Sequence, residues 1–388
     1  MAFRLSHTNL FRTTSSPVIG KVRLFSTSRA VFELRTSGRP LQCHVGVSFA
    51  SKDSPPFATR EEADASASKG FQTGPIARWK DQMLGQGTLR TELLKPSSED
   101  GKALNDVEQA KHIEAVISDR KRWGAGEDFF FTRQGVREFG EPVLLNDLPS
   151  LQKTVIGVSD GVGGWAASGH DPSLFSQALM WHAYKQSERN PSASVLKLLT
   201  NAYDGVMKEE NVPCGSATAC LSSFDSSTGI LESINLGDSG FSIIRDGEVF
   251  FEAPAQTHYF NCPRQLTKPE KGSDSSGMAM DLPEHGDLYS QKLQKGDMVV
   301  LYTDGLSDNV HNSQILALLK HVDSTLASPT NAFLLPEEKA LERARLFADV
   351  LVGYARLCMS RQDVVSPFEQ AAAKQGIRYP GGKIDEYV

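Results

Sequence analysis

Apolar positions recur with a short period along much of the chain, which predicts strands. Runs of four to ten residues rich in Val, Ile, Phe and Tyr are typical of strands when turn residues bound them. These runs lie at residues 41–50, 129–132, 154–158, 218–224, 230–236, 241–245, 248–252 and 298–302. Asp246-Gly247 separates two of them and is typical of a two-residue hairpin turn.

Helical periodicity appears in four other places. The first helix is expected after Asp171-Pro172, with Asp as its cap and Pro in its first turn. Apolar positions three and four apart predict the others at residues 195–206, 314–322 and 336–359. Because the helices are grouped and the strands form hairpins, the pattern favours an α+β fold over an alternating parallel sheet.

Two segments stand apart from this pattern. Residues 1–32 contain five Lys or Arg and no Asp or Glu, the composition of a mitochondrial transit peptide, which we expect to be cleaved near Phe25-Ser26. The remainder, residues 33–388, is expected to form one domain. The polar residues from about 53 to 114 are interpreted as a partly disordered insertion in that domain.

Composition narrows the classes of protein. The chain has 388 residues, of which 39% are hydrophobic and 23% are charged. These fractions are typical of a soluble globular protein. The net charge of −6 gives no basic field for nucleic acid. No apolar run approaches the roughly 18 residues that suggest a spanning helix. Five scattered cysteines without a CxxC pair favour free thiols over disulfides or structural zinc.

Acidic residues follow several of the predicted strands. Asp160-Gly161 and Asp304-Gly305 come directly after apolar runs, Asp238 follows another, and Glu127-Asp128 precedes one. Carboxylates that converge on one point repel each other unless a cation neutralises them, and oxygen ligands favour Mg²⁺ or Mn²⁺. An Asp-Gly pair after a strand is more often only a turn, so both interpretations stay open on spacing alone.

Five motifs occur in an order that resembles the PPM (type 2C) metal-dependent protein phosphatases. They are GED at 126–128, DGVGGW at 160–165, GSATAC at 215–220, LGDSG at 236–240 and LYTDGLSDN at 301–309. The resemblance covers roughly residues 116–388. The DGVGGW form and the GGKID at 381–385 resemble the mitochondrial branch of that family. A nucleotide-binding protein is disfavoured, because the glycine-rich loop lacks a Walker lysine and the GxGxxG spacing.

The resemblance implies a four-layer α/β/β/α sandwich of two antiparallel sheets flanked by helices, with two Mg²⁺ or Mn²⁺ ions at one end. It implies that Asp160 bridges both ions and that the Gly161 carbonyl binds one of them. Asp304 and Asp385 would bind the other, and Glu127 and Asp128 would complete the metal site, at least one of them through water. The resemblance favours a structural role for Asp238 over a ligating one. Asp160, Glu127 and Asp128 are the residues it assigns to catalysis.

The implied activity is hydrolysis of phosphoserine and phosphothreonine on mitochondrial proteins by a metal-activated water, without a phosphoenzyme. The partners would be phosphorylated proteins, and we expect a monomer in the mitochondrial matrix. Val162 stands where many relatives have a general-acid histidine, which leaves His170 as a weaker candidate. The usual phosphate-binding arginine has no clear match, because Trp123 stands near its place, and Lys121 and Arg122 are loose candidates for its role.

The C-terminus departs further from the family pattern. Asp385 is followed only by Glu386-Tyr387-Val388, where similar proteins continue as a central apolar strand. We therefore expect an exposed sheet edge and a loosely held Asp385. The alternative function is a catalytically weak or inactive phosphatase-like protein that binds phosphoproteins.

Overall fold

The computed structural model describes residues 41–54, 69–87, 124–135, 152–274, 276–386 and 388. All of these residues belong to one compact unit, Pro40–Val388. The predicted transit peptide, residues 1–32, lies outside the described residues. Most of the predicted insertion, residues 55–68 and 88–123, also lies outside them.

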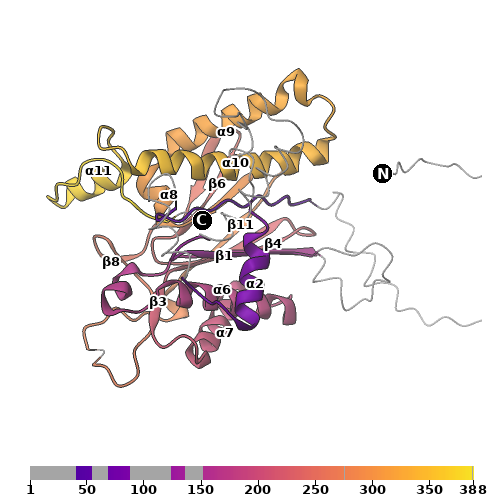
Figure 1. Ribbon diagram of the computed structural model, residues 1–388. Helices are drawn as coiled ribbons and strands as arrows, with labels where there is room; N and C mark the ends of the chain where they lie inside the picture. The colour runs from indigo at the N-terminus through magenta and orange to yellow at the C-terminus, as the bar shows by residue number, and fades with distance from the viewer. Residues whose placement is uncertain (1–40, 55–68, 88–123, 136–151, 275, 387) are drawn as a thin grey trace, which may run out of the picture. The chain divides into compact units, whose positions relative to one another are not determined.

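The larger sheet has five strands and is antiparallel throughout (Figure 1). Its order is β1-β2-β4-β5-β11, so each strand except the last lies beside a neighbour close in sequence. The strands are β1 (Phe129–Gln134), β2 (Lys153–Ser159), β4 (Ala219–Asp225), β5 (Ile230–Leu236) and β11 (Asp287–Lys292). Four of them confirm predicted strands, and β11 is an addition.

The second sheet has three described strands in the order β12-β6-β7. They are β12 (Met298–Tyr302), β6 (Gly240–Arg245) and β7 (Glu248–Glu252). The hairpin between β6 and β7 turns at Asp246 and Gly247, whose φ angles are 52° and 82°. Positive φ at both central residues is what the predicted turn requires. All three strands and the hairpin confirm the sequence prediction.

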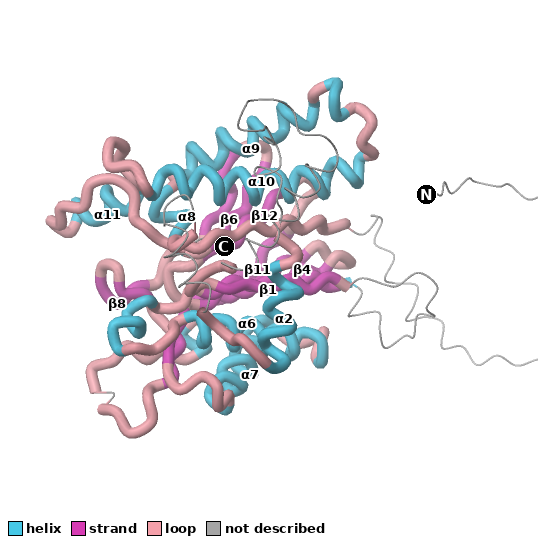
Figure 2. The backbone as a smooth tube through the Cα atoms, viewed as in Figure 1, coloured by secondary structure: helices cyan, strands magenta, loops and turns pink. Residues whose placement is uncertain are grey.

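Helices cover the outer face of each sheet (Figure 2). On the five-stranded sheet lie α6 (Ser173–Arg189) and α7 (Val195–Lys208), with α2 (Gly74–Leu84) beside them. On the three-stranded sheet lie α9 (Asn312–Ala327) and α10 (Pro336–Met359). The architecture is therefore the predicted α+β arrangement of two antiparallel sheets between helical layers.

Apolar packing joins the layers. Between the sheets, the rings of Phe241, Phe251 and Tyr289 meet with centroids 5.2–5.6 Å apart. Phe175 and Leu179 of α6 are fully buried against the five-stranded sheet. On the other side, Ile244 of β6 belongs to the cluster that α9 and α10 close. Burial of this kind stabilises by roughly 1.5–3 kcal/mol per large side chain.

Shorter elements complete the fold. Two small ladders pair β3 (Gly215–Ala217) with β10 (Leu266–Lys268) and β8 (Thr257–Tyr259) with β9 (Cys262–Pro263). Two short helices, α8 (Asp304–Asn309) and α11 (Pro367–Lys374), follow β12 and α10 along the chain. Single 3₁₀ turns occur at η1 (Gly163–Ser168), η2 (Pro283–His285) and η3 (Pro329–Asn331).

One predicted strand needs correction. Residues 41–50 were expected to form a strand, but they have no strand assignment and only Ala50 takes part in a β-bridge. Alternating apolar residues dictate an extended backbone, whereas a strand also needs a partner that local pattern does not specify. The described part of the predicted insertion contains a helix, α2, which buries Ile76, Trp79 and Met83. Their spacing of three and four residues after Gly74-Pro75 is a helical signal that the polar surroundings obscured.

The cysteines are free thiols in the structure, as predicted. In the described part of the chain, no helix combines the length and the apolar character needed to cross a membrane.

Candidate metal centre

Strand register brings acidic residues to one end of the five-stranded sheet. Phe129 at the start of β1 pairs with Ser159 at the end of β2. Asp128 and Asp160 are therefore the next residues beyond the same end of this ladder. Because neighbouring strands lie about 5 Å apart, the two side chains leave the sheet close together.

The second sheet contributes in the same way. Tyr302 at the end of β12 pairs with Gly240 at the start of β6. Asp304 and Asp238 consequently lie two residues beyond the same end of that ladder. Asp304 is also the first residue of α8, so its position is fixed by a strand on one side and a helix on the other.

The carboxylates gather into two groups that share Asp304. Oxygens of Asp160, Asp238 and Asp304 lie within 4.8 Å of one another, and so do oxygens of Asp304, Asp308 and Asp385. Three of the predicted ligands are thus brought into these groups: Asp304 belongs to both, Asp160 to the first and Asp385 to the second. Asp238, for which the sequence favoured a structural role, lies in the first group.

The loop after β2 is held by the segment that leads into β4. The Oγ1 atom of Thr218 accepts a 3.0 Å hydrogen bond from the Asp160 amide, and the Thr218 amide donates to the Asp160 carbonyl at 2.9 Å. The Val162 amide donates to the Ser216 carbonyl at 3.0 Å. These bonds fix the backbone on both sides of Gly161.

Gly161 allows a close approach between backbones. A Cβ at this position would lie 2.5 Å from the Glu127 carbonyl oxygen and 2.8 Å from that of Pro172. No other residue fits there without moving the loop, so glycine is needed for packing rather than for an unusual φ angle.

Asp160 is surrounded by negative charge. Burial raises the pKa of its carboxyl group well above the usual value, and the charges of Asp128, Asp304, Asp385 and Asp238 raise it further. For Asp238, burial and the Asp304 charge likewise raise the pKa. A site that disfavours ionised carboxylates so strongly is one that a divalent cation would stabilise.

Glu127 and Asp128 differ in what compensates their charge. Glu127 accepts from the Lys52 ammonium at 2.9 Å and from Lys69 at 3.4 Å. Asp128 is 1% exposed, and its Oδ2 has no hydrogen-bond partner among the described residues. Burial, followed by the charges of Glu386 and Asp385, raises the pKa of Asp128. Asp128 is therefore the better candidate of this pair to face a cation.

Lys383 lies inside the second group. Its ammonium contacts the Asp304 carboxylate and lies 2.8 Å from Asp308 Oδ2 and 3.0 Å from Asp385 Oδ2. Although burial opposes ionisation of Asp304, the Lys383 charge lowers the pKa of this carboxyl group. Burial and the Asp304 charge raise the pKa of Asp308 to about 7 and that of Asp385 to about 6.

The C-terminal residues are held more firmly than the sequence predicted. Thr303 exchanges two hydrogen bonds with Val388, each of 3.2 Å. Glu386 is 2% exposed and forms a 2.8 Å ion pair with Lys52. Asp385 is thus placed by contacts on both sides of it, not by a following strand, while β12 remains at the end of the described three-stranded sheet.

Sequence reasoning missed Asp308, Lys383 and Lys52 as members of this site. Asp308 follows Asp304 by four residues on α8, which places both on one helix face and was a usable signal. Lys383 stands two residues before Asp385, but nothing in its spacing predicts that the ammonium turns toward the carboxylates. Lys52 is distant in sequence from Glu127, and no feature of the sequence indicated that the two side chains would pair.

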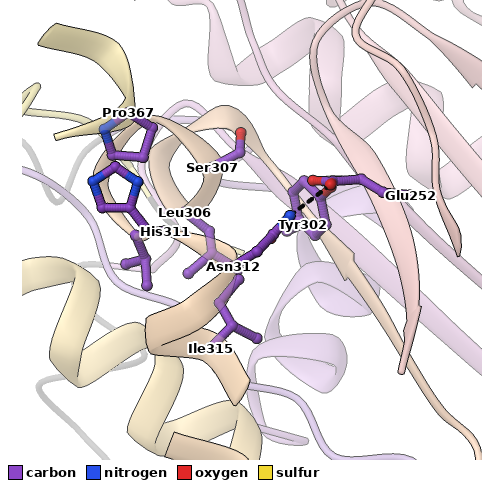
Figure 3. A pocket seen from close by; sticks show the side chains of 9 residues that line it. Glu252, Tyr302, Leu306, Ser307, His311, Asn312, Ile315 and Pro367 are labelled. Carbon is purple, nitrogen blue, oxygen red and sulfur yellow. Dashed lines mark hydrogen bonds between the residues drawn. The ribbon is translucent and has the colours of Figure 1, made fainter. Parts of the chain in front are cut away.

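A cavity of 190 Å³ is lined in part by α8 (Figure 3), and none of the residues of the two carboxylate groups lines it. Leu306, His311, Ile315 and Pro367 are among its lining residues. Glu252, the acidic residue among the described side chains that line it, accepts hydrogen bonds from the Tyr302 hydroxyl and the Asn312 amide. Because this carboxylate is already paired, the cavity is a poorer place for a cation than the two carboxylate groups.

Known proteins have sequences similar to that of this chain. Residues 152–342 match the family described as Stage II sporulation protein E (SpoIIE). The protein phosphatase PTC7 homolog fig of Drosophila grimshawi is 35% identical over 259 residues, which are 65% of this chain and 78% of that protein. The chain belongs to the PPM (type 2C) family of protein phosphatases.

Two further PPM relatives agree with this assignment. The protein phosphatase PTC7 homolog of Danio rerio is 36% identical over 236 residues, 60% of this chain and 74% of that protein. The X-ray structure of the photosystem II phosphatase PBCP has 26% sequence identity and a TM-score of 0.51, covering 68% of this chain and 89% of that one. The family and the enzyme class predicted from the sequence are confirmed: this PPM protein is a protein phosphatase.

Proposed function

We propose that this PPM phosphatase hydrolyses phosphoserine and phosphothreonine in proteins with the help of two divalent cations, Mg²⁺ or Mn²⁺. The observation that carries the proposal is the convergence of Asp160, Asp238 and Asp304, whose oxygens lie within 4.8 Å of one another. Oxygen-only donor sets favour these hard cations over zinc.

Unsatisfied oxygens support a cation at this place. Among the described residues, Asp304 Oδ1, Asp238 Oδ1 and Asp128 Oδ2 are buried without a hydrogen-bond partner. Buried polar atoms are nearly always paired, so three carboxylate oxygens without a partner at the same ends of the two sheets fit a site that binds a cation.

The proposed roles follow the predicted ligand set except at Glu127, whose carboxylate is already paired with Lys52 and Lys69. Asp160 would hold both ions and the Gly161 carbonyl would hold one of them, while Asp304 and Asp385 would hold the other. Asp128 would orient the centre from β1, and Glu127 would position Lys52 and Lys69 at its edge. Bound divalent ions supply a nucleophilic water of lowered pKa and neutralise charge on the phosphoryl group.

The leaving group needs a proton donor, and the two positions to consider are Val162 and His170. Val162 has no titratable side chain, and its amide is used in the bond to Ser216. The described contacts of His170 are with Trp165, at 6.2 Å between ring centroids, and with Glu270, at 3.8 Å. None of these contacts is with a residue of the two carboxylate groups. We therefore propose that solvent supplies the proton to the leaving group, and we expect His170→Gln to retain most of the activity.

The activity is tested on phosphopeptides. Purified full-length protein with Mn²⁺ is expected to release phosphate from phosphoserine and phosphothreonine peptides, and a phosphotyrosine peptide serves as the comparison. Binding of the phosphopeptides without phosphate release at any Mn²⁺ concentration would instead support the inactive phosphoprotein-binding alternative.

We also propose that the enzyme acts in the mitochondrial matrix. Support comes from residues 1–32, with five Lys or Arg and no acidic residue. Residues 1–32 fused to a fluorescent protein are expected to carry it into mitochondria. The matched control replaces Arg4, Arg12, Lys21, Arg23 and Arg29 by Gln. A reporter that stays in the cytosol, or enters mitochondria equally without these charges, would contradict the proposal.

A further inference from the structure

The ammonium group of Lys383 occupies a position among carboxylates where a cation is expected. Asp304, Asp308 and Asp385 surround it, at 2.8 Å and 3.0 Å for the last two. The Lys383 side chain is only 15% exposed, and its Nζ lies 5.2 Å from the centroid of the Phe368 ring. A buried lysine that contacts three carboxylates and an aromatic ring is part of the packed structure, not a solvated ion pair on the surface.

The backbone delivers this ammonium from a fixed position. Asn309 binds both sides of the Lys383 backbone: its Oδ1 accepts from the Lys383 amide at 2.9 Å, and its Nδ2 donates to the Lys383 carbonyl at 2.8 Å. The preceding Gly382 packs so closely on α10 that a Cβ there would lie 2.3 Å from the Cys358 carbonyl oxygen. The lysine therefore cannot leave the group by movement of its backbone, but its flexible side chain can swing away.

The two carboxylate groups differ in how their charge is compensated. In the group of Asp160, Asp238 and Asp304, two oxygens lack a partner among the described residues. In the group of Asp304, Asp308 and Asp385, Lys383 contacts every carboxylate. Asp304 belongs to both, since its Oδ2 meets Lys383 and its Oδ1 accepts no hydrogen bond from the described residues.

A divalent ion bound to the oxygens that Lys383 contacts and this ammonium cannot occupy the same space. Mg²⁺ needs its oxygens at about 2.0–2.1 Å, within the space that the lysine nitrogen fills at hydrogen-bonding distance. Two positive charges this close would also repel each other.

We propose that Lys383 is a tethered cation that competes with the second divalent ion for Asp304 and Asp385. The first ion binds at Asp160 without this competition, and the second binds only when the lysine side chain moves out. Lys383 thereby raises the metal concentration at which the two-ion centre is complete. The inference rests on the proposed metal centre and adds a regulatory element to it.

Metal binding by the full-length chain tests this directly. Metal-stripped protein is titrated with Mn²⁺ in equilibrium dialysis, and bound Mn²⁺ is counted per chain. Lys383→Met, which keeps an unbranched side chain of similar length and removes the charge, is expected to fill its second equivalent at a Mn²⁺ concentration about tenfold or more below that of the wild type. Lys383→Arg, which keeps the charge, and Lys374→Met on the exposed end of α11 are expected to bind as the wild type does.

Thermal unfolding separates competition from a purely structural role. Without metal, Lys383→Met is expected to melt at a lower temperature than the wild type, because three carboxylates lose their cation. Saturating Mn²⁺ should remove most of that difference, since the ion replaces the lysine. If Mn²⁺ does not stabilise Lys383→Met, or if this variant binds Mn²⁺ with the wild-type curve, the inference about Lys383 is wrong and the proposed metal centre still stands. A wild-type protein that binds no Mn²⁺ would overturn the proposed metal centre as well.

Discussion

Replacing Asp160 by asparagine is expected to lower the rate of phosphate release by about a hundredfold or more. Asp160 is the residue proposed to hold both ions, and its carboxylate is the one that four other acidic residues surround. An amide has the same shape but supplies no negative charge, so the cluster would lose the charge that attracts the cations. Steady-state phosphopeptide hydrolysis at saturating Mn²⁺ measures the effect.

The same variant should be at least as stable as the wild type when metal is absent. Burial and the neighbouring charges raise the pKa of Asp160, which means that the fold favours the neutral form over the ionised one. Above the pKa of an aspartate in the unfolded chain, this raised pKa lowers the stability of the metal-free protein, and the neutral amide removes that cost. Asp204→Asn on the exposed face of α7 is the control and should change neither activity nor the thermal midpoint. Near-normal turnover of Asp160→Asn would contradict the assignment.

Replacing Gly161 by alanine is expected to have the second largest effect on activity. The added Cβ would lie 2.5 Å and 2.8 Å from two backbone carbonyl oxygens, so the loop must move by several tenths of an ångström or more. That movement displaces the Gly161 carbonyl and the adjacent Asp160. A misplacement approaching about 1 Å can cost on the order of a hundredfold in rate. We expect a loss of about tenfold to a hundredfold, with weaker Mn²⁺ binding.

Gly164 in the same loop provides the matched control. A Cβ there would meet only the Val162 Cγ1 atom, at 4.0 Å. Gly164→Ala is therefore expected to keep activity and Mn²⁺ affinity within about twofold of the wild type. Equal behaviour of the two variants would show that the close approach at Gly161 does not position the centre.

Local pattern predicted the sandwich well, because most of its strands lie beside strands close in sequence. Residues 230–236 and 298–302 have the predicted bounds, and the hairpin at Asp246-Gly247 follows from the φ angles that its residues accept. Residues 41–50 show the limit of this reasoning. Their alternation predicts extended backbone, while pairing depends on a partner elsewhere in the chain.

The sequence predicted those residues of the candidate site that directly follow a strand. Asp160 and Asp304 follow apolar runs, and the antiparallel register then carries them to one end of the sandwich. Lys52 and Lys383 were not predictable in this way. Their roles depend on where a side chain turns after the tertiary fold has formed, and a lysine is more often a solvated surface residue.

The central claim is that these carboxylates hold divalent ions that are required for hydrolysis of a phosphorylated protein. The most direct measurement is phosphate release from a phosphothreonine peptide by the full-length enzyme, first stripped of metal with a chelator and then titrated with Mn²⁺. The claim predicts no release from the stripped enzyme, recovery with Mn²⁺ in the wild type, and no comparable recovery in Asp160→Asn. Full activity of the stripped enzyme, or equal recovery in the folded Asp160→Asn variant, would contradict it.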